Sequence, residues 1–186
     1  MVSPSPQMRS SLFAQRYAIQ RKLGAGSLGA VYLASDIGTK SQVALMIIHT
    51  ERLGPSAIPE MIARMQGEFR AITSLDHPQI AKAFDFGYTE PGGIPYYTRE
   101  YIQGAPLPAG PPGREPPPRF LRPILDLLDA LEYVHEQGIL HLDIHAGNLI
   151  VADQKERGSV LIDIGLLKPF EARRFTTSPK DWTSLP

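Results

Sequence analysis

The sequence contains no cysteine, so it can form no disulfide and offers neither a thiolate metal site nor a cysteine nucleophile. It has no excess of either charge, because 19 Lys and Arg residues balance 19 Asp and Glu residues. A dedicated binder of nucleic acid or of an anionic membrane normally carries a basic excess, so we expect neither partner. No apolar run is long enough to span a bilayer, and residues 1–11 lack the apolar core of a signal peptide. We therefore expect a cytoplasmic protein.

Proline, by contrast, is abundant and concentrated in one stretch. Residues 104–118 read GAPLPAGPPGREPPP and contain almost no apolar anchor. Because proline fixes its own backbone and has no amide hydrogen to donate, this stretch is predicted to be an extended linker. It divides the chain into a disordered N-terminal segment (1–16), a strand-rich part (17–103), the linker (104–118) and a second part (119–186).

The pattern of apolar residues predicts a mixed α+β fold. Runs rich in β-branched and aromatic residues predict strands at 17–23, 30–34, 42–49, 80–86 and 96–102. Apolar residues recur at three- and four-residue spacing over 59–74 and again over 119–137, which predicts one amphipathic helix on each side of the linker. Two short strands are predicted at 149–152 and 159–162.

A glycine-rich string, Gly24-Ala25-Gly26-Ser27-Leu28-Gly29, lies between the first two predicted strands. By itself it fits G-x-G-x-x-G, which also opens dinucleotide-binding units. Those units pass from a strand into a helix, whereas residues 30–34 are strand-like. A glycine-rich hairpin between strands is typical of a loop that covers the phosphates of a nucleotide, because glycine lets backbone amides approach phosphate oxygens. A flexible hairpin with no ligand is the alternative.

Further segments occur in an order that makes the match specific. Val43-Ala44-Leu45-Met46 stands where protein kinases have V-A-I-K, and Glu68 lies on the first predicted helix. Arg99-Glu100-Tyr101-Ile102 is similar to the hinge between kinase lobes. His141 to Asn148 matches H-R-D-L-x-x-x-N at its first, third and eighth positions, and Asp163-Ile164-Gly165 stands for D-F-G. The chain resembles a protein kinase domain, and the residues of its motifs are most similar to those of bacterial serine/threonine kinases of the eukaryotic type.

This resemblance implies a kinase-like fold and a nucleotide site. Residues 17–103 would form an antiparallel N-lobe sheet with one helix and the hinge, and residues 119–186 a partial helical C-lobe. The implied activity is transfer of the γ-phosphate of ATP, with Mg²⁺, to a protein hydroxyl. Asp143 and His145 would be catalytic, and Asn148 and Asp163 would hold the metal. The nucleotide would contact Leu23, Gly24, Gly26, Gly29, Val31, Ala44, Met46, Glu68, Glu100 and Ile102.

The sequence departs from the family pattern at several of these positions. Met46 replaces the lysine that grips the phosphates, and methionine has neither charge nor N–H donor. Leu142, His145 and Ile164 replace the arginine, lysine and phenylalanine of the family motifs. Impaired transfer is expected, and a pseudokinase that binds a nucleotide or a partner is the alternative. The string from His141 to Asn148 is also similar to the catalytic loop of aminoglycoside phosphotransferases, which gives a second alternative.

Arg99 occupies the gatekeeper position at the back of the implied ATP pocket. With Met46 uncharged, Glu68 would lack its usual lysine partner, and a buried carboxylate without a partner is costly. A guanidinium at position 99 has the length to form a bidentate pair with a carboxylate. We therefore predict an ion pair between Arg99 and Glu68.

The predicted metal ligands Asn148 and Asp163 are present, whereas the lysine that grips the phosphates is replaced by Met46. We therefore also predict weak, Mg²⁺-dependent binding of ATP.

Overall fold

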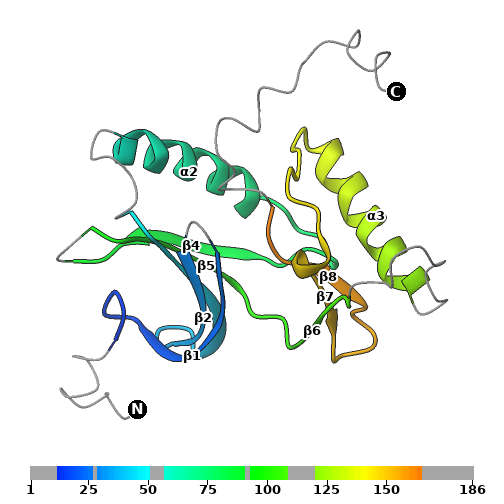
Figure 1. Ribbon diagram of the computed structural model, residues 1–186, viewed down its shortest axis with the longest axis horizontal. Coiled ribbons are helices and arrows are strands. Elements are labelled where there is room, and N and C mark those ends of the chain that lie inside the picture. Colours follow the sequence, from blue (N-terminus) through cyan, green and yellow to red (C-terminus); the bar gives the residue numbers. More distant parts are fainter. Residues whose placement is uncertain (1–11, 27–28, 51–56, 91–92, 109–119, 165–186) are drawn as a thin grey trace, which may run out of the picture.

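The computed structural model describes residues 12–26, 29–50, 57–90, 93–108 and 120–164. In this part of the chain two antiparallel sheets lie side by side, and each is accompanied by one helix (Figure 1). The predicted α+β fold is confirmed. The end of the predicted partial C-lobe (165–186), most of the Pro-rich linker (109–118) and the first eleven residues fall outside the described residues.

The larger sheet carries most of the residues of the expected nucleotide site. Its strands follow the order β1-β2-β3-β5-β4, and every neighbouring pair is antiparallel. The strands are β1 (Tyr17–Gly26), β2 (Gly29–Asp36), β3 (Ser41–Ile48), β4 (Ala83–Tyr88) and β5 (Pro95–Glu100). The fourth strand begins three residues later than predicted. Residues 79–81 do not join this sheet because their backbone bonds to the second sheet instead.

Each face of the larger sheet packs against different residues. Helix α2 (Ala57–Thr73) covers one face, where its Met65 and Phe69 pack against Met46 and Tyr97 (Figure 1). The alternation of side chains along β2 and β3 places a second cluster, formed by Tyr17, Ala34, Val43 and Leu45, on the opposite face. Met46 and its cross-strand partners therefore face α2 and the interior.

The smaller sheet has the order β6-β7-β8 and packs against helix α3 (Leu121–Glu136). Its strands are β6 (Gly104–Pro106), β7 (Leu149–Ala152) and β8 (Ser159–Leu161). The sequence did not predict β6, which lies at the start of the expected linker. As an edge strand, β6 tolerates a proline at its end, because one side of an edge strand needs no ladder hydrogen bonds.

Helix α3 buries only part of its predicted apolar stripe. Ala130 and Val134 are completely buried in a cluster with Ile72 of α2 and with Leu75 and Ile80, which follow that helix. Four large side chains nearer the start of the helix are exposed, namely Leu121, Ile124, Leu125 and Leu128. Asp126, in contrast, is buried between these apolar residues and accepts a hydrogen bond from the amide of Ser159 at 2.7 Å.

The described structure includes residues 12–16, which the sequence assigned to the disordered N-terminal segment. Phe13 forms a backbone bridge with Tyr17, and its ring contacts Tyr96 edge to face. Arg16 donates from Nε and Nη2 to the Asp36 carboxylate at 2.8 and 2.6 Å. This bidentate pair fastens the start of β1 to the end of β2.

The Arg16–Asp36 pair predicts a loss of stability in acid. The Arg16 hydrogen bond outweighs the opposing effect of burial and lowers the pKa of Asp36 from 3.8 to about 2. A depressed folded-state pKa stabilises the fold above the unfolded pKa, and this contribution is lost as the pH falls from about 4 to 2. We expect about 2 kcal/mol of unfolding free energy to disappear over this range.

Urea denaturation at pH 5 and at pH 2 would measure this loss, with Asp36→Asn as the comparison because it cannot titrate. The variant should be less stable at pH 5 and should lose about 2 kcal/mol less on acidification. An equal acid loss in both proteins would contradict the assignment. Asp76→Asn is a matched control, because the exposed Asp76–Lys82 pair contributes little.

Candidate active site

The glycine-rich hairpin between β1 and β2 contains three glycines with two different roles. A Cβ atom added to Gly24 or Gly26 would meet nothing within 4 Å, so both backbones are accessible from the space above the sheet. At Gly29 an added Cβ would lie 2.1 Å from the carbonyl oxygen of Ile47. Gly29 is therefore required for the close approach of β2 to β3, a structural reason that the motif alone did not reveal.

The strand register places Met46 at the centre of the interior face. Val31 on β2 and Tyr97 on β5 are its direct cross-strand partners, and Ala44 on the same face is opposite Arg99. Ala44 is 1% exposed and Met46 9% exposed. The position that carries a lysine in kinases is thus filled by a buried thioether packed among Met65, Phe69 and Tyr97 in the α2 cluster. The predicted nucleotide residue Leu23 on β1 is half-exposed at the edge of this region.

The predicted ion pair between Arg99 and Glu68 is wrong. The Glu68 carboxylate instead pairs with Arg64 one turn earlier on α2, at 2.9 Å from the Arg64 Nε. The Arg99 Nε lies 3.3 Å from Oδ1 of Asp163. The helix glutamate has a local partner on its own helix, so the guanidinium reaches the other predicted acidic residue of the site.

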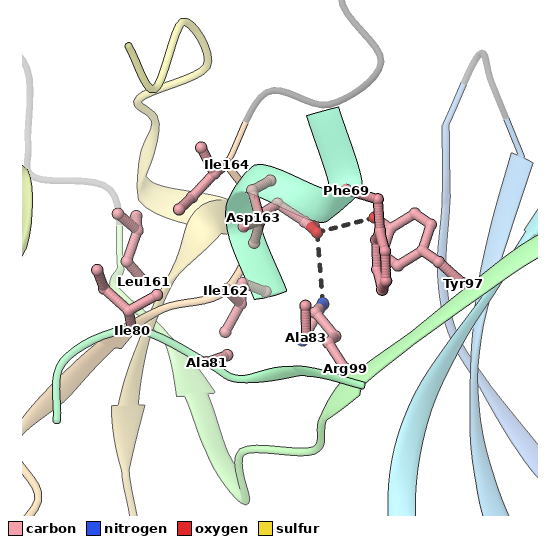
Figure 2. A pocket seen from close by; sticks show the side chains of 11 residues that line it. Phe69, Ile80, Ala81, Ala83, Tyr97, Arg99, Leu161, Ile162, Asp163 and Ile164 are labelled. Carbon is pink, nitrogen blue, oxygen red and sulfur yellow. Dashed lines mark hydrogen bonds and ion pairs between the residues drawn. The ribbon is translucent and has the colours of Figure 1, made fainter. Parts of the chain in front are cut away.

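Asp163 is held by two donors from β5 (Figure 2). Its Oδ1 accepts a hydrogen bond from the Tyr97 hydroxyl at 3.1 Å and faces the Arg99 Nε. Burial, reinforced by the nearby Asp163 charge, raises the pKa of Tyr97 well above its usual value. The phenol therefore stays protonated and acts as a donor. We call Tyr97, Arg99 and Asp163 the β5 clamp.

The catalytic-loop residues lie together around Asp143. The Asn148 amide nitrogen donates to the carbonyl oxygen of Asp143 at 2.9 Å and lies 3.5 Å from its Oδ2. His145 Nε2 lies 3.7 Å from the same carboxylate, and its Nδ1 accepts from the amide of Gly147 at 3.1 Å. His141 is buried, which lowers its pKa and keeps it neutral, and its Nδ1 accepts from the Asp143 amide.

The hinge is tied to the second sheet through the side chain of Glu100. Its carboxylate makes a bidentate pair with Arg157, on the turn between β7 and β8, with the Nη2–Oε2 bond at 2.7 Å. Burial would raise the pKa of Glu100, but the Arg157 bonds outweigh it and lower that pKa. The backbone N–H of Glu100 donates to the Lys82 carbonyl at 2.8 Å, so it is engaged within the protein. Ile102 is buried against Ala81, Ile150 and Val160.

A cavity behind Arg99 has a volume of only about 20 Å³. It is lined mainly by apolar side chains from α2, from residues 80–83 and from residues 161–164, with Arg99 and Asp163 at one side (Figure 2). Space of this size holds about one water molecule, so the cavity is not a ligand pocket in itself.

No group of three or more His, Cys, Asp or Glu side chains in the part of the chain that the structure describes is arranged to hold a metal ion. Among the described helices, none combines the length and apolar character needed to cross a membrane.

The fold and the order of these residues define a protein kinase domain. Residues 17–181 match the protein kinase domain family, and the chain belongs to this family. Protein kinases of this family generally use ATP and Mg²⁺.

Relatives among curated proteins are bacterial serine/threonine kinases. The chain is 34% identical over 160 residues to Serine/threonine-protein kinase PksC of Streptomyces coelicolor, covering 82% of this chain and 28% of the relative. It is 32% identical over 182 residues to Serine/threonine-protein kinase PknA of Mycobacterium tuberculosis, covering 92% and 40%. The chain thus spans well under half the length of either protein.

Solved structures agree with this assignment. The PknI kinase domain of M. tuberculosis aligns with a TM-score of 0.66 and 27% identity, covering 83% of this chain and 60% of that structure. A structure of Rad53 in complex with AMP-PNP aligns with a TM-score of 0.63 and 22% identity, covering 82% and 39%, a likeness that concerns the fold alone.

Sequence reasoning missed two residues that shape this site. Tyr97 is a donor to Asp163, and Arg157 holds the hinge carboxylate of Glu100. A tyrosine in a strand and an arginine in a turn carry no local signal for either role. Strand alternation placed Tyr97 on the same face as Arg99, which was the only available indication.

Proposed function

We propose that this chain binds ATP between its two sheets as a serine/threonine kinase module whose phosphotransfer to a protein hydroxyl is strongly reduced. The observation that carries the proposal is the geometry around Asp143, where Asn148 fixes the loop and His145 lies beside the carboxylate. Such a carboxylate can orient a substrate hydroxyl and accept its proton. The residues expected to enclose the adenine are Leu23, Val31, Ala44 and Ile102, with Gly24 and Gly26 above the phosphates.

Met46 is the reason for expecting reduced transfer. Phosphoryl transfer depends on positioning the phosphates and neutralising their charge. A thioether does neither, and the Glu68 carboxylate that would pair with a lysine is bonded to Arg64. The absence of a phosphate-binding lysine also supports the alternative that the chain is a pseudokinase, in which nucleotide binding serves a regulatory partner.

The residues expected to hold Mg²⁺ fit it unequally. Asn148 fits, because its amide nitrogen is bonded to Asp143 and its amide oxygen is the atom left to face a cation. Asp163 does not fit, because one carboxylate oxygen already faces a guanidinium and a phenol. Mg²⁺ prefers several oxygen ligands at near-ideal octahedral positions, and a neighbouring fixed cation opposes it.

Calorimetric titration with ATP, followed by an assay of radiolabelled γ-phosphate transfer, tests the proposal. We expect saturable ATP binding with little transfer. Asp143→Asn should abolish the residual transfer and leave the ATP dissociation constant within about twofold, because the loss concerns the transition state alone. Asp153→Asn, an exposed residue on the turn after β7, is the matched control and should change neither quantity. Absence of ATP binding would refute the proposal, as would transfer that is insensitive to Asp143→Asn.

A further inference from the structure

We infer that Arg99 is the resident counter-ion of Asp163 and excludes a divalent cation from this carboxylate, so that nucleotide binding is independent of Mg²⁺. The inference deepens the proposed function and rests on it for the nucleotide. It replaces the Mg²⁺-dependent binding that the sequence predicts.

The first line of support is the geometry of the β5 clamp. The Arg99 side chain is 10% exposed, and its Nε lies 3.3 Å from Asp163 Oδ1. The Tyr97 hydroxyl, on a residue that is 5% exposed, donates to the same oxygen at 3.1 Å. A cation and a donor that converge on one carboxylate oxygen satisfy the charge and one acceptor position that a metal would otherwise use.

The second line of support is that Arg99 is fixed in this place. Its Nη1 donates to the carbonyl oxygen of Glu100 at 3.4 Å, and β5 is paired on both sides, with β3 and with β4. Glu68, the acidic residue of α2 that the sequence paired with Arg99, is already bonded to Arg64. Figure 2 shows the Arg99 side chain directed from β5 toward Asp163. Moving it away would leave a buried guanidinium without its carboxylate, which is unfavourable.

The third line of support comes from Met46, which lies on the same face of the sheet as Arg99. A lysine at position 46 would put a second cation next to Arg99 in a buried space, and like charges there repel strongly. The register opposes Met46 to Tyr97 and Ala44 to Arg99, so both members of the clamp on β5 adjoin β3. An uncharged residue at position 46 therefore avoids the repulsion that a lysine there would have with Arg99. The cation on this face thus stands on β5 at position 99, where it pairs with Asp163, and not on β3 at position 46.

The consequence for ligands follows from charge. With Asp163 neutralised by Arg99, a nucleotide meets no requirement for a metal at this position. Mg²⁺ masks phosphate charge on free ATP, but it gains no protein ligand from Asp163. The ATP dissociation constant should therefore change by less than about twofold between Mg²⁺ and a chelator.

The experiment measures metal directly as well as nucleotide. Mn²⁺ is used as a spectroscopic substitute for Mg²⁺, and bound Mn²⁺ is counted by electron paramagnetic resonance with and without ATP. We expect no Mn²⁺ site in the wild-type protein that is sensitive to Asp163→Asn. Arg99→Met should create one, and Arg99→Met/Asp163→Asn should remove it again. In calorimetry the Arg99→Met protein should bind ATP at least about tenfold more tightly with Mg²⁺ than without.

Two further variants separate charge from structure. Arg99→Lys keeps a cation at position 99 and should behave as the wild type. Arg70→Met removes an exposed arginine from α2 and should have no effect on metal or nucleotide. Circular dichroism and thermal melts show which variants are folded. If Arg99→Met does not fold, Tyr97→Phe, which removes one donor from Asp163 and keeps the ring, should give partial entry of Mn²⁺.

Several outcomes would overturn the inference. A wild-type Mn²⁺ site lost on Asp163→Asn shows that Arg99 does not exclude the metal, and so does tenfold tighter ATP binding with Mg²⁺. Failure of folded Arg99→Met to gain an Mn²⁺ site shows that Arg99 is not the cause of exclusion. A protein that binds no ATP, yet gains Mn²⁺ on Arg99→Met, refutes the proposed function and supports the clamp.

Discussion

The double variant Met46→Lys/Arg99→Met is expected to bind Mg·ATP about tenfold to a hundredfold more tightly than the wild type. This is the range given by one new charge-assisted interaction, about 1.5–3 kcal/mol. Lysine at 46 would extend from the middle of β3 on the interior face, toward the region that the β5 clamp now occupies. Removing Arg99 at the same time avoids two adjacent cations and releases Asp163 for the metal.

Calorimetry of the single and double variants measures this gain. Met46→Lys alone should improve ATP binding less than the double variant, because the new lysine and Arg99 repel each other and compete for Asp163. Met46→Leu is the matched control, since it keeps an apolar side chain of similar volume and should leave the dissociation constant unchanged. Equal affinities for the single and double variants would show that the two positions are not coupled. γ-Phosphate transfer should rise with the affinity, and Asp143→Asn in the double variant should remove it.

Replacing Asp126 by alanine is expected to lower the free energy of unfolding by about 3 kcal/mol. The Asp126 carboxylate is 4% exposed and accepts from the buried amide of Ser159 at 2.7 Å and from the Arg122 Nε at 2.7 Å. Its loss removes hydrogen bonds to a charged group and leaves a buried N–H unsatisfied, each of which costs between about 1 and 3 kcal/mol. Because Ser159 begins β8, the strand that leads to Asp163, the site should become less ordered as well.

Urea denaturation of Asp126→Ala and Asp126→Asn would measure the effect. Asparagine keeps an acceptor but not the charge, so it should lose only part of the stability. Asp129→Ala is the control, because Asp129 lies one turn further along α3, is exposed, and pairs with His77 at 3.4 Å. A second test is Gly158→Ala. The Cβ atom added at this position would lie 2.5 Å from the Asp126 carboxylate, and the backbone of Gly158 has a positive φ of 71°. If Asp126→Ala and Asp129→Ala were equally stable, the buried hydrogen bond would not be a major contribution.

The family motifs predicted the fold well because they fix local features. Glycines between two strand patterns gave the β1–β2 hairpin, and the apolar spacing gave α2 and α3 to within a few residues. Asn148 lies beside Asp143 because both are on one short loop where few conformations are possible, while the role predicted for it as a metal ligand stays a prediction.

The partners of charged side chains could not be predicted in the same way. Arg99 has two acidic groups within the reach of a long side chain, and the sequence contains no information on which is closer. The choice depended on Arg64, whose helical spacing to Glu68 satisfies that carboxylate first. Similarly, β6 follows from pairing with β7, a long-range contact that overrides a proline-rich local composition.

Two backbone hydrogen bonds connect residues 79–81, in the segment after α2, to β8. The amide of Ala81 donates to the carbonyl of Leu161 at 2.9 Å, and the amide of Leu161 donates to the carbonyl of Gln79 at 2.8 Å. Leu161 is two residues before Asp163, while residues 79–81 closely follow α2. The link therefore couples the segment that follows α2 to the strand that leads to Asp163, so the place of this helix and the place of Asp163 beside Arg99 depend on the same two backbone hydrogen bonds.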